Sequence, residues 1–189
     1  MIFNSHSALV GKHAFLSPSQ YSWVNYDEQR LENRYYLASA AVRGTDLHNL
    51  AHHAIRLRVH IHEAEKTLSA YVDDAIFYDL VVEQPLYYSD NCFGTPDTIG
   101  FSDSFLRIHD LKTGVNKTSE RQLEIYAALF CLEYSISPFE IDIELRIYQS
   151  GEVRIYVPTP EFILELMDKI ILFDKRIEYM KEVGNRASR

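Results

Sequence analysis

Two aspartates and a lysine stand close together in the segment FGTPDTIGFSDSFLRIHDLKTG, residues 93–114. Side chains along a strand alternate between its two faces, so a strand here puts Asp110 and Lys112 on one face and His109 on the other. Asp97 stands at the start of the preceding strand. A hairpin between the two strands therefore brings the carboxylates of Asp97 and Asp110 together.

Two convergent carboxylates repel each other unless a cation lies between them. Oxygen ligands of this kind suit Mg²⁺ or Mn²⁺, and the backbone carbonyl of Leu111 is a further candidate ligand. A divalent cation polarises a phosphodiester, while the ammonium of Lys112 orients a water and stabilises developing charge. The structural alternative is an exposed Asp–Lys ion pair worth ~0 to 1 kcal/mol, since short motifs also match by accident.

The periodicity of the chain predicts which elements hold these residues. Ser17-Pro18 indicates a short helix to residue 23, and a second helix is expected over residues 31–42. Gly44 should end it, and Thr45 should cap a new helix that carries His48. Another helix is expected over residues 68–80.

Later segments alternate between strands and helices. Strands are expected over residues 81–86, 98–101, 105–111, 141–148 and 153–157. Thr118 or Ser119 should cap a helix that ends before Pro138, and Thr159-Pro160 should open a long final helix. The order predicts an α/β (α+β) fold with a central mixed sheet flanked by helices. We expect a single domain over residues 1–189.

The composition is that of an ordinary folded protein, with 47% hydrophobic and 24% charged residues. No apolar run approaches the ~20 residues of a membrane span, and no basic segment precedes an apolar one at the amino terminus. We therefore expect a cytoplasmic protein without a membrane partner. The net charge of −8 argues against non-specific coating of nucleic acid. It does not exclude a nuclease, because metal-binding carboxylates count as negative until cations bind.

The succession GTPD, HDLKTG and RQLEIYA resembles the nuclease core of the PD-(D/E)XK superfamily, in its RecB-like branch. The resemblance implies a restriction-endonuclease-like core in which Asp97, Asp110 and Lys112 are catalytic. It also implies that Gln122 and Tyr126, one helical turn apart, reach the active site or the nucleic-acid backbone. Arg121, at the start of the same helix, is a candidate phosphate contact.

Upstream, RGTDLHNLAHHA resembles the family's Gly-x-x-x-His element, which implies that His48 is a metal ligand with Asp97 and Asp110. The segments HAFLSPSQYSW, AYVDDAI and VVEQPL are similar to small RecB-like nucleases of phages and prophages, so the protein is expected to act in a host cytoplasm. Some relatives hold an iron–sulfur cluster on four cysteines. This chain has two cysteines, so no such cluster is expected.

The resemblance implies a DNA exonuclease that requires Mg²⁺ or Mn²⁺ and acts in recombination or end processing. A homo-oligomer or a recombination partner protein is compatible with that role. One alternative is an endonuclease specific for single strands or for DNA structure. Another is a nucleic-acid-binding module with a degenerate site. A third is a zinc-binding structural protein that uses His48, His52, His60 or His62.

Overall fold

The computed structural model describes residue 5, residues 7–61 and residues 66–187. The chain divides into two compact units, Met1–Thr45 and Asp46–Arg189. The division falls inside helix α1 (Glu28–Leu57). The expectation of a single domain over residues 1–189 stays a prediction.

The first unit contains two short 3-10 helices, η1 (Ser7–Leu9) and η2 (Pro18–Asn25), and the beginning of α1. The sequence predicted an ordinary helix opened by Ser17. Ser17 does precede η2, but its side chain caps no backbone amide, and its hydroxyl lies 2.8 Å from that of Ser19. Gln20 also leaves the helical conformation, with φ −115° and ψ 49°. The segment therefore consists of two 3-10 turns separated by a kink at Gln20.

Helix α1 runs without a break through Gly44 and Thr45. The expected helix end at Gly44 and the expected cap at Thr45 are therefore wrong. A glycine in a helix interior costs only about 1 kcal/mol relative to alanine, which tertiary packing easily offsets. The continuous helix carries His48 on its carboxy-terminal half.

A five-stranded sheet in the order β1-β4-β5-β6-β7 forms the centre of the second unit. The sheet is mixed, because β5 and β6 pair in parallel and the other neighbours pair antiparallel. This confirms the predicted α/β class with a central mixed sheet. The strands are β1 (Val81–Val82), β4 (Thr98–Ser102), β5 (Phe105–Lys112), β6 (Asp142–Gln149) and β7 (Glu152–Tyr156).

A two-residue turn joins β4 to β5 and fixes their register. Asp103 and Ser104 both have positive φ, 50° and 61°, as the tightest hairpin turns require. Ser102 consequently pairs with Phe105. Each later pair along the hairpin follows from this turn, including the pairs nearest Asp97 and Asp110.

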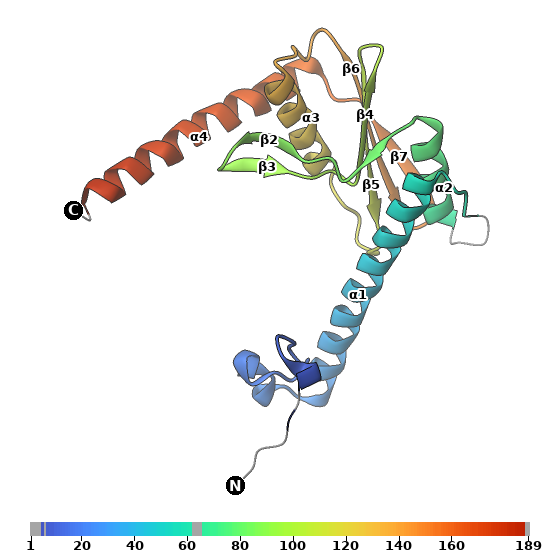
Figure 1. Ribbon diagram of the computed structural model, residues 1–189, viewed down its shortest axis with the longest axis vertical. Helices are drawn as coiled ribbons and strands as arrows, with labels where there is room; N and C mark the ends of the chain where they lie inside the picture. Colours follow the sequence, from blue (N-terminus) through green and yellow to red (C-terminus); the bar gives the residue numbers. More distant parts are fainter. Residues whose placement is uncertain (1–4, 6, 62–65, 188–189) are drawn as a thin grey trace. The chain divides into compact units, whose positions relative to one another are not determined.

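Helices cover both faces of the sheet (Figure 1). On one face α3 (Arg121–Tyr134) and the start of α4 (Pro160–Ala187) pack over Leu106 and Ile108 of β5. On the other face α2 (Lys66–Phe77) and the end of α1 pack over Leu111 and Tyr148. The alternation predicted for β5 is confirmed, since its even-numbered and odd-numbered residues enter different cores.

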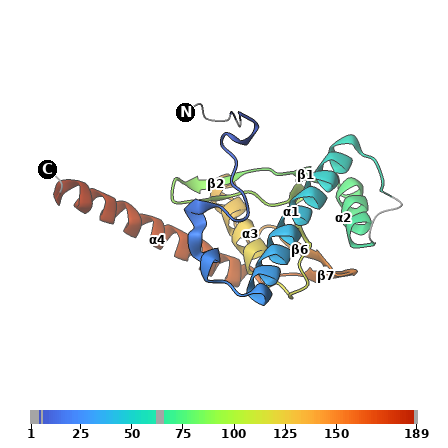
Figure 2. The same ribbon diagram turned by 90° about the horizontal axis from the view of Figure 1, so that it is seen from below.

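The expected strand over residues 81–86 divides into β1 and β2 (Leu86–Ser89), with Glu83 at φ 51° between them. The second piece pairs with β3 (Cys92–Gly94) in a separate hairpin that packs beside α3 (Figure 2). Helix α3 begins after Glu120, not directly after Thr118 or Ser119 as expected, although the hydroxyl of Ser119 accepts a hydrogen bond from the Arg121 amide at 3.1 Å. Among the described residues, none of the helices is both long and apolar enough to cross a membrane.

Candidate metal centre

Helix α1 presents two histidines on one face, because residues four positions apart lie one turn apart. The rings of His48 and His52 meet edge to face with their centroids 6.1 Å apart. His52 is buried, and burial lowers its pKa below the ordinary value, while the carboxylate of Glu83 opposes that shift. Burial therefore favours the neutral form of His52, the form that binds metals.

Asp97 lies between this helix and strand β5. Its Oδ2 accepts a hydrogen bond from the backbone amide of Leu111 at 2.9 Å. The same oxygen lies 3.5 Å from Nδ1 of His48. One candidate ligand atom from each of His48, His52 and Asp97 lies within 4.8 Å of the other two. This spacing suits ligands that share one cation.

Asp110 lies beside Asp97 in the sheet. Thr98 pairs with His109, so the residues next to this pair, Asp97 and Asp110, face each other across the hairpin. Asp110 is 4% exposed. Burial raises its pKa above the ordinary value, and the carboxylate of Asp97 raises it further, while Lys112 opposes the shift. The site therefore holds two close carboxylates, one of them inside the protein.

A chain of polar contacts leads from Asp110 to helix α3. The amine Nζ of Lys112 lies 3.0 Å from Oδ2 of Asp110 and donates a hydrogen bond to Oε1 of Gln122 at 3.1 Å. The amide of Gln122 donates to the hydroxyl of Tyr126 at 3.2 Å, and that hydroxyl donates to the backbone carbonyl of Thr95 at 3.0 Å. The structure thus brings Gln122 and Tyr126 into contact with the Asp–Lys pair.

Oδ2 of Asp110 is not fully satisfied as a hydrogen-bond acceptor by the Lys112 amine. Although Oδ2 of Asp110 is within ion-pair distance of this amine, it accepts no hydrogen bond of good geometry from any described residue. Buried carboxylate oxygens normally have a hydrogen-bond partner or bind a cation. An acceptor of this kind beside Asp97 fits a divalent cation.

The glycine of the GTPD segment allows Tyr126 to approach. A Cβ atom added at Gly94 would lie 2.8 Å from Cε1 of Tyr126, closer than two carbon atoms can pack. A side chain at position 94 would therefore displace the Tyr126 ring from the Thr95 carbonyl.

The roles predicted for Arg121 and Leu111 stay predictions. Arg121 pairs with Glu124 at 3.0 Å, and its guanidinium lies 4.6 Å from the ring centroid of Phe162 on α4. None of its described contacts reaches Lys112 or the aspartates. Leu111 contacts Asp97 through its amide, and its carbonyl points to the same strand edge, because both backbone groups of a strand residue do so. Its role as a ligand stays a prediction.

His52 and Glu83 have more contacts at the site than the sequence indicated. One oxygen of Glu83 lies 3.4 Å from Nδ1 of His52, and the other accepts a hydrogen bond from Arg56 at 2.8 Å. The four-residue spacing of the histidines is the sequence signal for His52, and that spacing by itself indicated only a zinc site. Glu83 lies in the turn between β1 and β2, and this turn brings its carboxylate beside His52.

His109 belongs to the opposite face of the sheet. Burial, assisted by Arg146 and Arg107, lowers its pKa to about 3. Its Nδ1 lies 3.3 Å from the hydroxyl of Tyr148, which donates a hydrogen bond to Asp74 at 2.6 Å. This histidine is a core residue, and it takes no part in the cluster around Asp97.

We compared the chain with protein-family models and with curated protein sequences. Neither comparison finds a match. The geometry of the site and the chemistry of its side chains are therefore the basis for assigning a function.

Proposed function

We propose that this protein is a divalent-metal-dependent nuclease of the PD-(D/E)XK superfamily that hydrolyses phosphodiester bonds in DNA. One observation carries the proposal: Lys112 lies 3.0 Å from Asp110, and the hairpin register sets Asp97 opposite Asp110. An exposed ion pair, the structural alternative, would leave both partners in water. Here Asp110 is 4% exposed, and a buried carboxylate beside a second carboxylate is a common feature of functional sites.

The side chains fit Mg²⁺ or Mn²⁺. The donors available are carboxylate oxygens of Asp97 and Asp110 and the imidazole of His48, a set that suits a hard or borderline divalent cation. The acceptor of Asp110 that lacks a hydrogen bond of good geometry supports this assignment. Once bound, such a cation supplies Lewis-acid polarisation of the phosphodiester and lowers the pKa of a water.

Lys112 has the central catalytic role among the chain's own residues. Its ammonium can orient the attacking water and stabilise the negative charge that develops on the phosphoryl oxygens. The Gln122 side chain holds this amine at 3.1 Å from the α3 side. Tyr126 holds Gln122 in turn through its hydroxyl, and the hydroxyl is fixed on the Thr95 carbonyl. Gln122 and Tyr126 are thus positioning residues.

We further propose that the protein acts on DNA ends as an exonuclease in recombination or end processing. The test compares a linear duplex with a covalently closed circle of the same sequence, each with Mn²⁺ and with EDTA. We expect metal-dependent loss of the linear DNA and survival of the circle. Cleavage of the circle would identify an endonuclease instead, and no cleavage of either, together with none of a single strand, would contradict the nuclease proposal.

A zinc-binding role is the second candidate, and the spacing of His48, His52 and Asp97 within 4.8 Å favours it, since two imidazoles suit Zn²⁺. Metal analysis of the purified protein after dialysis separates the two. Stoichiometric zinc that EDTA removes only with loss of folded structure would indicate a structural zinc site. Weakly held, exchangeable metal is the result that the nuclease proposal requires.

A further inference from the structure

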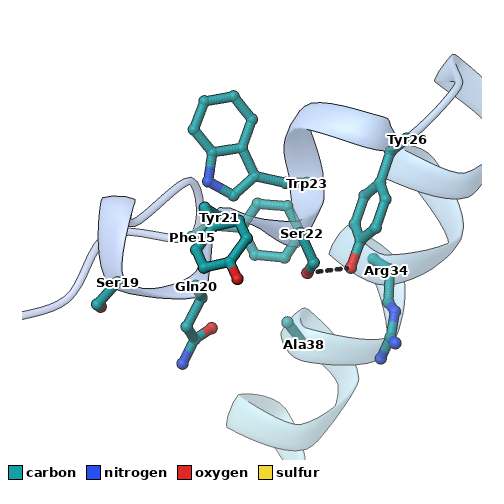
Figure 3. Close-up of a pocket in the computed structure, with 9 residues that line it drawn as sticks. All are labelled: Phe15, Ser19, Gln20, Tyr21, Ser22, Trp23, Tyr26, Arg34 and Ala38. Atoms are coloured by element: carbon teal, nitrogen blue, oxygen red, sulfur yellow. Dashed lines mark hydrogen bonds between the residues drawn. The ribbon is translucent and has the colours of Figure 1, made fainter.

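The first unit contains an open pocket of about 760 Å³ whose lining includes four aromatic residues, Phe15, Tyr21, Trp23 and Tyr26. Figure 3 shows that these rings come from η2 and the residues flanking it, and that the side chain of Arg34 comes from α1. Sites for small organic ligands commonly measure ~300 to 1,000 Å³. The pocket is therefore large enough for a planar ring and its substituents.

Local contacts hold two of these rings in place. The indole Nε1 of Trp23 donates a hydrogen bond to the carbonyl of Ser17 at 3.0 Å. The hydroxyls of Tyr26 and Ser22 lie 3.2 Å apart, and the guanidinium of Arg30 lies 4.6 Å from the centroid of the Tyr26 ring. A ring that is already fixed loses little conformational entropy when a second ring stacks on it.

The charge of the first unit suits a polyanion better than the charge of the second does. Residues 1–45 contain four Lys or Arg and three Asp or Glu, whereas residues 46–189 contain 15 and 24. Arg34 lines the pocket itself. Proteins bind unpaired nucleotides with aromatic rings that stack on the bases and with cationic groups that hold the phosphates. The first unit offers both, and its near-neutral charge does not repel phosphate.

We propose that this pocket binds a base of a single-stranded nucleic acid, stacked on its aromatic rings with a phosphate near Arg34. The inference names the strand form of the substrate and rests on the proposed nuclease function. A duplex keeps its bases stacked inside the helix, so only an unpaired segment can offer a base to the pocket.

Trp23 is the one tryptophan in the chain, so tryptophan emission reports on this pocket directly. The full-length protein is titrated in EDTA, which prevents metal-dependent cleavage, with an oligothymidylate, with thymidine monophosphate and with heparin. We expect saturable quenching by the oligonucleotide, much weaker quenching by the mononucleotide, and none by heparin. Equal affinity for the mononucleotide would overturn the assignment to a strand, and absence of quenching by the oligonucleotide would overturn the pocket itself.

Tyr21→Ala is the variant that tests the stacking. Tyr21 is 73% exposed, so its loss should not unfold the protein. Removing one stacking ring should weaken oligonucleotide binding by ~5- to 150-fold. The matched control is Tyr179→Ala on α4, where Arg176 also lies over the ring, 5.2 Å from its centroid. The control should bind like the wild type, and an equal loss in both variants would contradict the proposal.

The two proposals fail separately. If the oligonucleotide quenches Trp23 but the protein cleaves no DNA in Mn²⁺, the pocket assignment stands and the nuclease function is wrong. If the protein cleaves DNA but no oligonucleotide quenches Trp23, the nuclease function stands and the pocket assignment is wrong.

Discussion

The chemistry of the site begins with one residue, the buried Asp110. Burial and the neighbouring Asp97 raise its pKa, so the folded protein holds a proton on Asp110 more tightly than the unfolded chain does. Where this carboxylate is ionised, its charge destabilises the fold. A functional carboxylate that costs stability is a common feature of active sites.

The variant Asp110→Asn should therefore be more stable than the wild type in EDTA at pH 7, by about 0.5 to 2 kcal/mol. Chemical denaturation measures this difference in the free energy of unfolding. The difference should shrink as the pH falls through the raised pKa and below the ordinary value of 3.8, because the wild-type carboxyl is then protonated in both states. Asp103→Asn, in the exposed turn of the same hairpin, is the control and should change little.

In the presence of a divalent metal, the wild type should become more stable than Asp110→Asn. Mn²⁺ should stabilise the wild type by about 2.7 kcal/mol at a concentration 100 times its Kd, since a ligand that binds only the folded state shifts the equilibrium by mass action. Asp110→Asn should lose most of that gain. An equal rise in Tm for both proteins would mean that the metal binds elsewhere.

At the scale of elements, a second polar network lies on the opposite face of the sheet from Asp110. Arg146 of β6 is 8% exposed and bonds to Asp74 at 2.8 Å, to Glu144 at 2.9 Å and to Tyr78 at 3.0 Å. These contacts connect β6 to α2. Removing this largely buried cation leaves the Asp74 carboxylate without its ion-pair partner.

Arg146→Met should consequently lower the free energy of unfolding by about 3 to 5 kcal/mol. Arg58→Met is the matched control, because Arg58 pairs with Asp79 at the surface and such pairs contribute ~0 to 1 kcal/mol. Urea denaturation of both variants checks the prediction. Equal losses would show that the Arg146 network does not support the packing of α2 on the sheet.

The sequence predicts elements where one local rule decides the structure. The alternation along β5 was enough to place Asp110 and Lys112 on one face. The short turn at Asp103 was enough to place Asp97 across the hairpin from Asp110. The continuity of α1 through Gly44 could not be predicted, because a glycine in a helix interior costs only about 1 kcal/mol, which is too little to fix a helix end. The polar contact from Tyr126 to Thr95 ends on a backbone carbonyl, which leaves no signal in the sequence.

At the scale of the whole molecule, the charges are distributed unevenly along the chain. The second unit, which contains the candidate metal centre, has 15 Lys or Arg against 24 Asp or Glu, whereas the first unit has four against three. A divalent cation bound there neutralises part of the negative charge of the site carboxylates, which weakens their repulsion of DNA phosphates. DNA affinity should therefore depend on divalent cations even where no cleavage occurs.

The central claim is that Lys112 acts on the reaction itself. The most direct test is the rate of DNA cleavage by Lys112→Ala in Mn²⁺ at saturating DNA, with affinity measured in Ca²⁺ by fluorescence anisotropy. Loss of the transition-state contact, worth ~3 to 4 kcal/mol, should slow cleavage by roughly 10² to 10³ while affinity changes far less. Lys117→Ala, an exposed lysine in the loop before α3, should cut at the wild-type rate. If Lys112→Ala cuts as fast as the wild type and only binds more weakly, Lys112 is a DNA contact and the catalytic assignment is wrong.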